Sequence, residues 1–354
     1  MSPRSSLVVV AVAWLCVSST VGAWAAPAWE VSNPIQPLPK PPLGLQSTFA
    51  DLETPPTPER VRLGRWLFYD TRLSGDGTLA CVSCHVPALA FSELKPTSTG
   101  IHGQRGVRKA PSFVNMAWTI YPNFFWDGRA STLKEQALSP IINPIEMGSS
   151  HGSMVTTLTG IDGYRPYFRE AFGSDAITKE HVAHAIADYE RTRMSGNSPV
   201  DRWRVGRDER AVSAEVKQGY ELFFNKAECN QCHLGENYTD GRFHNLGIGW
   251  DAKVQRLKDP GRFAITGKDE DRGAFKTPGL REVAKHPPYM HDGSVPTLQA
   301  AVEHYNVGGI ANPWLSTRVR KLELRSAEVQ ALVRFLESLS GEGYAHTAPT
   351  AFPE

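Results

Sequence analysis

The sequence lacks any strong bias of charge. Its 354 residues contain 38 Lys and Arg against 37 Asp and Glu, and no basic run occurs anywhere. Proteins that bind nucleic acid need a concentrated basic face for the phosphates, so this class of function is excluded. Long apolar stretches are also missing after the first 25 residues, so no membrane span is expected in the remainder of the chain.

The first 25 residues have the pattern of a signal peptide. Arg4 supplies a positive start, residues 7–17 are almost wholly apolar, and residues 23–25 read Ala-Trp-Ala, a small-x-small cleavage site. A retained membrane anchor is the alternative, but the apolar core is short for a span. We therefore expect a cleaved signal peptide over residues 1–25 and export to the periplasm.

Cysteine is scarce, and its placement is informative. Cys16 leaves with the signal peptide, and the other four form two C-x-x-C-H frames, Cys81–Cys84–His85 and Cys229–Cys232–His233. Disulfides would not need a histidine after each pair, and zinc would need four ligands where each frame supplies three. C-x-x-C-H is the attachment pattern of a c-type haem, with the histidine beneath the iron. The sequence therefore predicts two covalent haems.

Strand patterns are scarce as well. Residues 26–57 are proline-rich and predict an extended lead-in, and no sustained alternation of apolar and polar residues follows. Apolar spacing instead predicts helices over residues 60–69, 181–194, 213–225 and 326–339. The expected fold is mainly α, with long loops.

An internal repeat accompanies the two haem motifs. Residues 109–111 (Lys-Ala-Pro) have a counterpart in 276–278 (Lys-Thr-Pro), and 126–133 (Trp-Asp-Gly-x-x-x-Thr-Leu) one in 291–298 (His-Asp-Gly-x-x-x-Thr-Leu). The Thr of each copy is a predicted helix N-cap. The repeat predicts two haem domains, residues 58–206 and 207–354, with the boundary in the charged stretch 205–211.

The two copies differ on the side of the haem opposite the proximal histidine. The second copy offers His304 and Tyr305 as distal ligands, whereas the first has Pro140 at the aligned position, followed by Glu146. A carboxylate beside an open iron is a suitable general acid or base for cleaving the O–O bond. This asymmetry indicates a division of labour between the haems, as an enzyme requires.

The sequence resembles the bacterial di-haem cytochrome c peroxidase and MauG family over nearly all of residues 58–340. The resemblance implies two cytochrome c-like haem domains that face each other, a peroxide-reactive first haem and an electron-relaying second haem. The stretches that carry it, besides both haem motifs, are 63–70 (Leu-Gly-Arg-Trp-Leu-Phe-Tyr-Asp), 125–130 (Phe-Trp-Asp-Gly-Arg-Ala), 143–147 (Asn-Pro-Ile-Glu-Met), 273–278 (Gly-Ala-Phe-Lys-Thr-Pro) and 288–293 (Pro-Tyr-Met-His-Asp-Gly).

The resemblance also assigns roles to single residues. Trp126 matches the tryptophan between the haems, and Glu146 matches the distal acid of the first haem. His102 resembles a loop histidine that caps the first haem at rest and swings away on activation. A calcium ion between the haems is common in the family, but Lys109 stands where its asparagine ligand is expected, and an ammonium cannot ligate Ca²⁺. One calcium ion therefore stays possible here through backbone carbonyl ligands.

Tyr305 separates the branches of the family. Peroxidases that take electrons from small carriers usually have Met at this position, whereas MauG-type enzymes resemble this chain in having Tyr. Tyrosinate lowers the iron potential and Met raises it. His304 and Met290 are the alternative ligands.

The sequence thus predicts a periplasmic MauG-like di-haem peroxidase, monomeric or homodimeric, that uses H₂O₂ to oxidise an aromatic side chain of a partner protein or another reductant. The first alternative is a cytochrome c peroxidase that takes electrons from a small cytochrome or cupredoxin. The second is a non-catalytic di-haem electron carrier.

Overall fold

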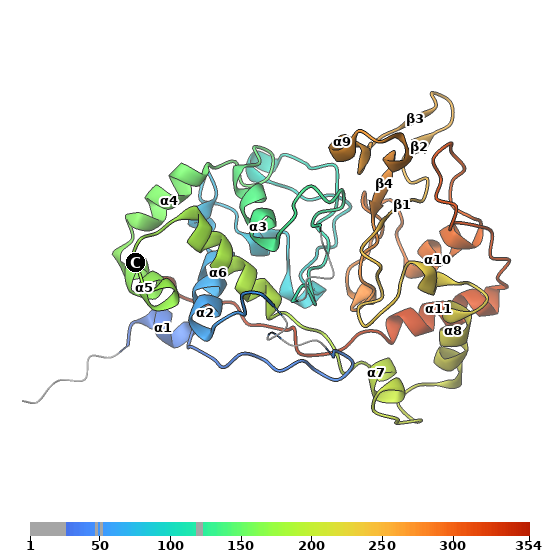
Figure 1. The fold of residues 1–354 in the computed structure, drawn as a ribbon, viewed down its shortest axis with the longest axis horizontal. Helices are drawn as coiled ribbons and strands as arrows, with labels where there is room; N and C mark the ends of the chain where they lie inside the picture. Colours follow the sequence, from blue (N-terminus) through green and yellow to red (C-terminus); the bar gives the residue numbers. More distant parts are fainter. Residues whose placement is uncertain (1–25, 47–48, 50–51, 118–122) are drawn as a thin grey trace, which may run out of the picture.

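The computed structural model describes residues 26–354, apart from 47–48, 50–51 and 118–122, so the predicted signal peptide lies outside it. Two halves lie side by side, one containing helices α1 to α6 and the other α8 to α11 with the strands (Figure 1). The helices are α1 Ala28–Ser32, α2 Pro58–Tyr69, α3 Leu133–Ile142, α4 His151–Thr159, α5 Arg165–Phe172, α6 Lys179–Arg191, α7 Pro199–Arg204, α8 Ala214–Phe224, α9 Phe263–Thr266, α10 Leu298–Asn306 and α11 Ser326–Glu337. The strands are β1 Phe243–Asn245, β2 Trp250–Asp251, β3 Arg256–Leu257 and β4 Ala274–Lys276.

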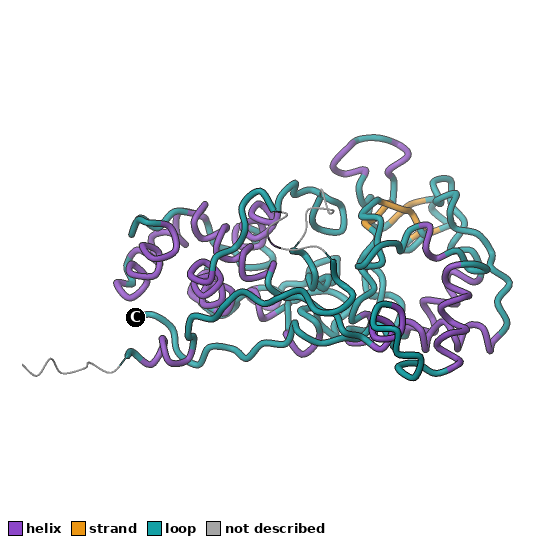
Figure 2. The backbone as a smooth tube through the Cα atoms, turned by 60° about the horizontal axis from the view of Figure 1, so that its bottom comes forward, coloured by secondary structure: helices purple, strands orange, loops and turns teal. Residues whose placement is uncertain are grey.

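The four predicted helices are confirmed as α2, α6, α8 and α11, with ends that differ by at most three residues. Strands are few and short: β1 pairs with β4 and β2 with β3, both antiparallel, all within the second half. Figure 2 shows that most of the remaining chain is loop. The helix-rich prediction with long loops is therefore confirmed. None of the helices in the described part of the chain has both the length and the apolar character to cross a membrane.

Each half has its own hydrophobic core built around a pair of helices. In the first half α2 packs on α6, and in the second α8 packs on α11. A glycine makes each contact close: a Cβ on Gly64 would lie 1.8 Å from the carbonyl oxygen of Ala185, and one on Gly219 would lie 2.0 Å from that of Ala331. Both glycines belong to a Gly-x-x-Leu-Phe pattern, so the internal repeat begins ahead of the haem motifs.

The repeat predicted after the haem motifs is present in the backbone. Each Asp-Gly turn is closed by an isolated antiparallel bridge, between residues 124 and 130 in the first half and between 289 and 295 in the second. The next helix then begins at a threonine in both copies. Thr132 accepts the N–H of Glu135 to cap α3, and Thr297 caps α10 in the same way, so both predicted N-caps are confirmed.

The two ends of the described chain meet on the first half (Figures 1 and 2). The proline-rich lead-in begins with the short helix α1, where the sequence predicted only extended chain. The Ser32 hydroxyl donates to the carbonyl of Ala351, and the Arg65 guanidinium donates to that of Thr347. The C-terminal segment therefore leaves α11 and returns to pack beside α1 and α2, adding Tyr344 to the first core.

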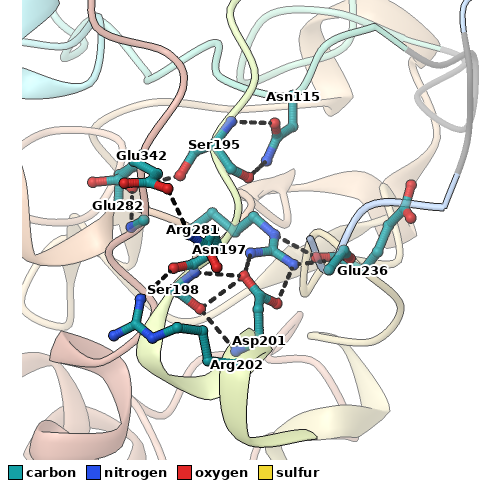
Figure 3. Close-up of polar contacts among 12 residues, drawn as sticks. Asn115, Ser195, Asn197, Ser198, Asp201, Arg202, Glu236, Arg281, Glu282 and Glu342 are labelled. Atoms are coloured by element: carbon teal, nitrogen blue, oxygen red, sulfur yellow. Dashed lines mark hydrogen bonds and ion pairs between the residues drawn. The ribbon is translucent and has the colours of Figure 1, made fainter. Parts of the chain in front are cut away.

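A buried polar network joins the halves near α7 (Figure 3). Arg281 of the second half forms a bidentate ion pair with Asp201 of α7, at 2.7 and 2.9 Å, and also donates to the carbonyl of Gly44 in the lead-in. Asn115 and Ser195 exchange two hydrogen bonds through the backbone of Ser195. These contacts fix the lead-in, α7 and the second half relative to one another.

Candidate haem sites

The first C-x-x-C-H motif begins in a single 3₁₀ turn, Cys81–Ser83. The Nδ1 atom of His85 lies 2.8 Å from the carbonyl oxygen of Phe91, whose positive φ of 56° turns that carbonyl inward. A carbonyl only accepts, so Nδ1 carries the proton and Nε2 keeps its lone pair for a metal. Burial lowers the pKa of His85, which keeps the ring neutral.

The second motif repeats this arrangement. Cys229–Gln231 forms the 3₁₀ turn, and the Nδ1 atom of His233 lies 2.9 Å from the carbonyl oxygen of Tyr238, again at positive φ. All four cysteines are free thiols, so neither pair forms the disulfide considered above. Two thiols followed by a histidine with an oriented, neutral ring are the donor set that a c-type haem needs, and both sites fit it.

A large cavity opens over the second motif, and we call it the second-haem cavity. Its empty volume is about 1500 Å³, and Cys229, Cys232 and His233 line it. Most of the remaining wall is apolar, which suits a porphyrin. It includes Phe223, Ile248, Val302, Leu332 and Leu336.

The three candidate distal ligands occupy different positions. Tyr305, on the last turn of α10, lines the second-haem cavity, and so does Met290. The Nε2 atom of His304 instead lies 3.0 Å from the carbonyl oxygen of Leu246. Burial, followed by the nearby cysteines, raises the pKa of Tyr305, so the phenol keeps its proton unless a cation takes its place.

Trp126 contacts both halves. Its indole N–H donates to the carbonyl of Lys109 at 2.9 Å, and its own carbonyl accepts the amide N–H of Lys276 from the second half at 2.8 Å. The side chain lines the second-haem cavity and also a cavity of about 960 Å³ between the halves. Residues of both repeats, including Pro111 and Pro278, line this second cavity.

Glu146 lies just beyond the C-terminal end of α3, in a turn in which its amide donates to the carbonyl of Asn143 at 3.0 Å. Burial raises its pKa, and Arg129 and Asn143 only partly oppose this. The charge of Glu146 acts on the first haem motif. The pKa of the Cys84 thiol is raised to about 11, mainly by burial and further by the negative charges of Glu93 and Glu146. The structure therefore brings Glu146 near the first haem motif as a half-buried carboxylate that takes up a proton readily.

His102 points away from this region. Its side chain is 66% exposed, with Nδ1 3.7 Å from a carboxylate oxygen of Asp76. The loop that carries it is nevertheless docked beside Glu146, because the amide of Ile101 donates to the Glu146 carbonyl at 2.9 Å. Gly100 serves this close contact, since a Cβ there would lie 1.9 Å from the carbonyl oxygen of Ile145.

The surroundings of Lys109 do not fit a calcium ion. Its ammonium donates to the carbonyl of Glu93 and lies 3.3 Å from that of Lys95, so a cation already occupies these oxygens. Calcium needs six to eight oxygen ligands.

Sequence analysis did not identify the polar residues beside the second motif. His244 lies 3.1 Å from a carboxylate oxygen of Asp240 and 3.5 Å from the sulfur of Cys232. In the described part of the chain these three residues are the one group close enough to hold a metal ion, but Cys232 belongs to the haem motif. Arg318 and Arg320 line the same cavity. The i, i+4 spacing of Asp240 and His244 is a weak signal, because it does not show that the loop leading to β1 brings both residues to Cys232.

Comparison with known proteins agrees with this geometry. Residues 58–209 match the family model described as "Di-haem cytochrome c peroxidase". The methylamine utilization protein MauG of Methylorubrum extorquens is 42% identical over 296 residues, covering 83% of this chain and 82% of that protein. Cytochrome c551 peroxidase of Nitrosomonas europaea is 34% identical over 92% of this chain and 90% of its own length.

Among solved structures, a MauG-like protein associated with microbial copper homeostasis superimposes with a TM-score of 0.76. It is 31% identical, and the match covers 89% of this chain and 97% of that one. Sequence, fold and the two oriented haem motifs therefore lead to one conclusion. The chain belongs to the di-haem cytochrome c peroxidase family that includes MauG, and it is a di-haem peroxidase with two c-type haems.

Proposed function

We propose that this chain is a periplasmic peroxidase of the MauG type, which transfers the oxidising power of H₂O₂ to an aromatic side chain of a partner protein or to another reductant. The observation that carries the proposal is Tyr305, a tyrosine in the wall of the cavity that contains His233. The signal-peptide pattern of residues 1–25 supports export. Residues 58–206 and 207–354 would form the two haem domains.

The first haem site is the proposed place of reaction with peroxide. Haem would supply the redox chemistry when bound, and His85 would present Nε2 to the iron. Glu146 would take a proton from one oxygen of the peroxide and return it to the other oxygen as the O–O bond breaks. Its raised pKa suits both steps, because the carboxylate is then a better base and the acid still donates readily.

Trp126 is the proposed electronic link between the sites. It lines the second-haem cavity, and hydrogen bonds to backbone groups of both halves hold it in place. An indole in this position shortens the electron hop between haem domains that face each other. A fixed ring also needs little rearrangement as charge passes.

Tyr305 is the proposed distal ligand of the second haem, in preference to His304, and Met290 in the same cavity wall is the alternative. The His304 ring is engaged with a backbone carbonyl. Tyr305 would release its proton to bind iron, and the anionic oxygen would stabilise the oxidised metal. An anionic Tyr305 ligand would therefore favour the storage of oxidising equivalents until a protein substrate, which reacts slowly, is oxidised.

A cytochrome c peroxidase is the second candidate function. The 34% identity to cytochrome c551 peroxidase and the histidine loop docked beside Glu146 favour it. In that case His102 would swing inward to cap the first haem at rest. Glycines with positive φ, such as Gly103, would allow the movement.

The test uses the haem-loaded protein and measures what H₂O₂ oxidises. The MauG-type proposal expects a fully oxidised sample to react with stoichiometric peroxide without prior reduction, and then to oxidise tryptophan or tyrosine in a candidate partner, seen as a mass change. Reaction only after half-reduction, with rapid turnover of a reduced small cytochrome, would instead establish the peroxidase. Two low-spin haems that do not react with peroxide would contradict both candidate functions.

A further inference from the structure

Lys109 lies where three segments of the chain meet between the haem motifs. Its amide N–H donates to the carbonyl of His291, in the second half, at 2.8 Å. Its own carbonyl accepts the indole N–H of Trp126 at 2.9 Å. One residue therefore ties Trp126 to the His-Asp-Gly turn of the other half.

The side chain of Lys109 fixes the same residue to the first haem motif. Its ammonium donates to the carbonyl of Glu93 and approaches that of Lys95 at 3.3 Å. Residues 93–95 directly follow the loop closed by the bridge between Val86 and Ser92, which begins next to His85. Lys109 as a whole is 4% exposed, so these contacts are shielded from water.

The Glu93 carboxylate affects the charge of the Lys109 ammonium. Burial lowers the pKa of Lys109 to about 8, and the nearby Glu93 opposes that shift. The Glu93 carboxylate accepts the amide N–H of Ala110 at 3.1 Å, so it too is fixed beside the lysine backbone. Two backbone carbonyls accept from the buried ammonium, and the charge of the nearby Glu93 carboxylate also favours its protonated form.

We infer that Lys109 is a positioning residue whose ammonium is the built-in cation between the haem sites, in place of a bound divalent ion, and that it holds Trp126 for electron transfer. This inference rests on the proposed role of Trp126. It explains why carbonyl oxygens converge here without a metal-ligating side chain from residue 109. It also means that transfer between the haems does not depend on calcium.

The experiment compares three variants of the haem-loaded protein with wild type. Lys109→Met keeps the length of the side chain and removes its charge. Lys95→Met is the matched control, because the Lys95 side chain is exposed and belongs to the same loop as Glu93. Trp126→Phe tests the proposed link itself. Stopped-flow spectra after peroxide addition give the delay between the changes at the first and the second haem, and elemental analysis gives the calcium content.

We expect Lys109→Met to slow the response of the second haem by about tenfold or more, as for a small misplacement of a reacting group. Lys95→Met should match wild type, and Trp126→Phe should be slow. Wild type should contain no stoichiometric calcium, and a chelator should not change its rate. The chelator measurement needs no variant, so it decides the question even if Lys109→Met fails to fold.

Two results would overturn the inference about Lys109 and leave the proposed role of Trp126 intact. The first is wild-type transfer in Lys109→Met while Trp126→Phe is slow. The second is one calcium ion per chain in wild type whose removal slows transfer. Unchanged transfer in Trp126→Phe would overturn the proposed role of Trp126 and the inference with it.

Discussion

The ion pair between Arg281 and Asp201 makes a quantitative prediction about how the halves are held together. Both side chains are almost fully buried, at 3% and 5% exposure, and the guanidinium binds both carboxylate oxygens. Arg281 also donates to the carbonyl of Glu236 at 2.6 Å. Arg281→Met would remove these contacts and leave a buried carboxylate without its partner.

The expected cost of Arg281→Met is about 3–5 kcal/mol of unfolding free energy, the range for breaking a buried pair from one side. Asp201→Asn should be similarly costly, because it leaves the guanidinium buried. The double variant should lose less than the sum, with a coupling free energy of about 2 kcal/mol or more. Arg334→Met is the control, since its ion pair with Glu337 is exposed to water and contributes little to stability.

Urea unfolding of the haem-loaded variants, followed by circular dichroism and haem absorbance, measures these free energies. Strictly additive single variants would refute the reasoning, because the pair would then contribute nothing beyond its separate side chains. An Arg281→Met variant no less stable than Arg334→Met would refute it as well.

Three further changes give separable results. Glu146→Gln should slow the reaction with peroxide by about 10²–10⁴-fold in stopped-flow absorbance, since it removes the proton carrier; an unchanged rate would exclude that role. Although burial opposes it, the ion pair with Asp240 raises the pKa of His244, so the stability lost in His244→Gln should be greatest below pH 6.5 and decrease as the pH rises through the raised pKa in thermal melts. A pH-independent loss would contradict this. Gly64→Ala should destabilise the folded protein by about 1–3 kcal/mol, because the added methyl group clashes with α6. Gly152→Ala, at an open position of α4, is the control and should be neutral or stabilising. Equal effects of the two substitutions in urea unfolding would show that the close helix contact tolerates a methyl group.

The parts of this protein that depend on short-range pattern could be predicted from sequence. The haem motifs, the main helices and the threonine caps are set by residues a few positions apart, so spacing alone identifies them. The repeat also gave the correct order of motif, turn and helix in both halves. Its earlier part, the glycines at 64 and 219, was missed because their purpose is contact with a helix distant in sequence.

Contacts between distant segments could not be predicted. In the sequence, His304 and Tyr305 are neighbours on one predicted helix. Only the contact of His304 with the backbone carbonyl of Leu246, which is distant in sequence, distinguishes their positions. Lys109 was recognised as a departure from the family pattern, but its carbonyl partners follow from loop geometry. The return of the C-terminal segment to the first half is likewise a product of tertiary packing.

The central claim is that Tyr305 binds the second haem iron and so distinguishes this enzyme from a simple cytochrome c peroxidase. Low-temperature EPR of oxidised wild type and Tyr305→Phe, before and after peroxide, tests it most directly. If Tyr305 is the ligand, the substitution should abolish or shift the low-spin signal of the second haem and prevent storage of oxidising equivalents there. An unchanged low-spin signal in Tyr305→Phe would contradict the account.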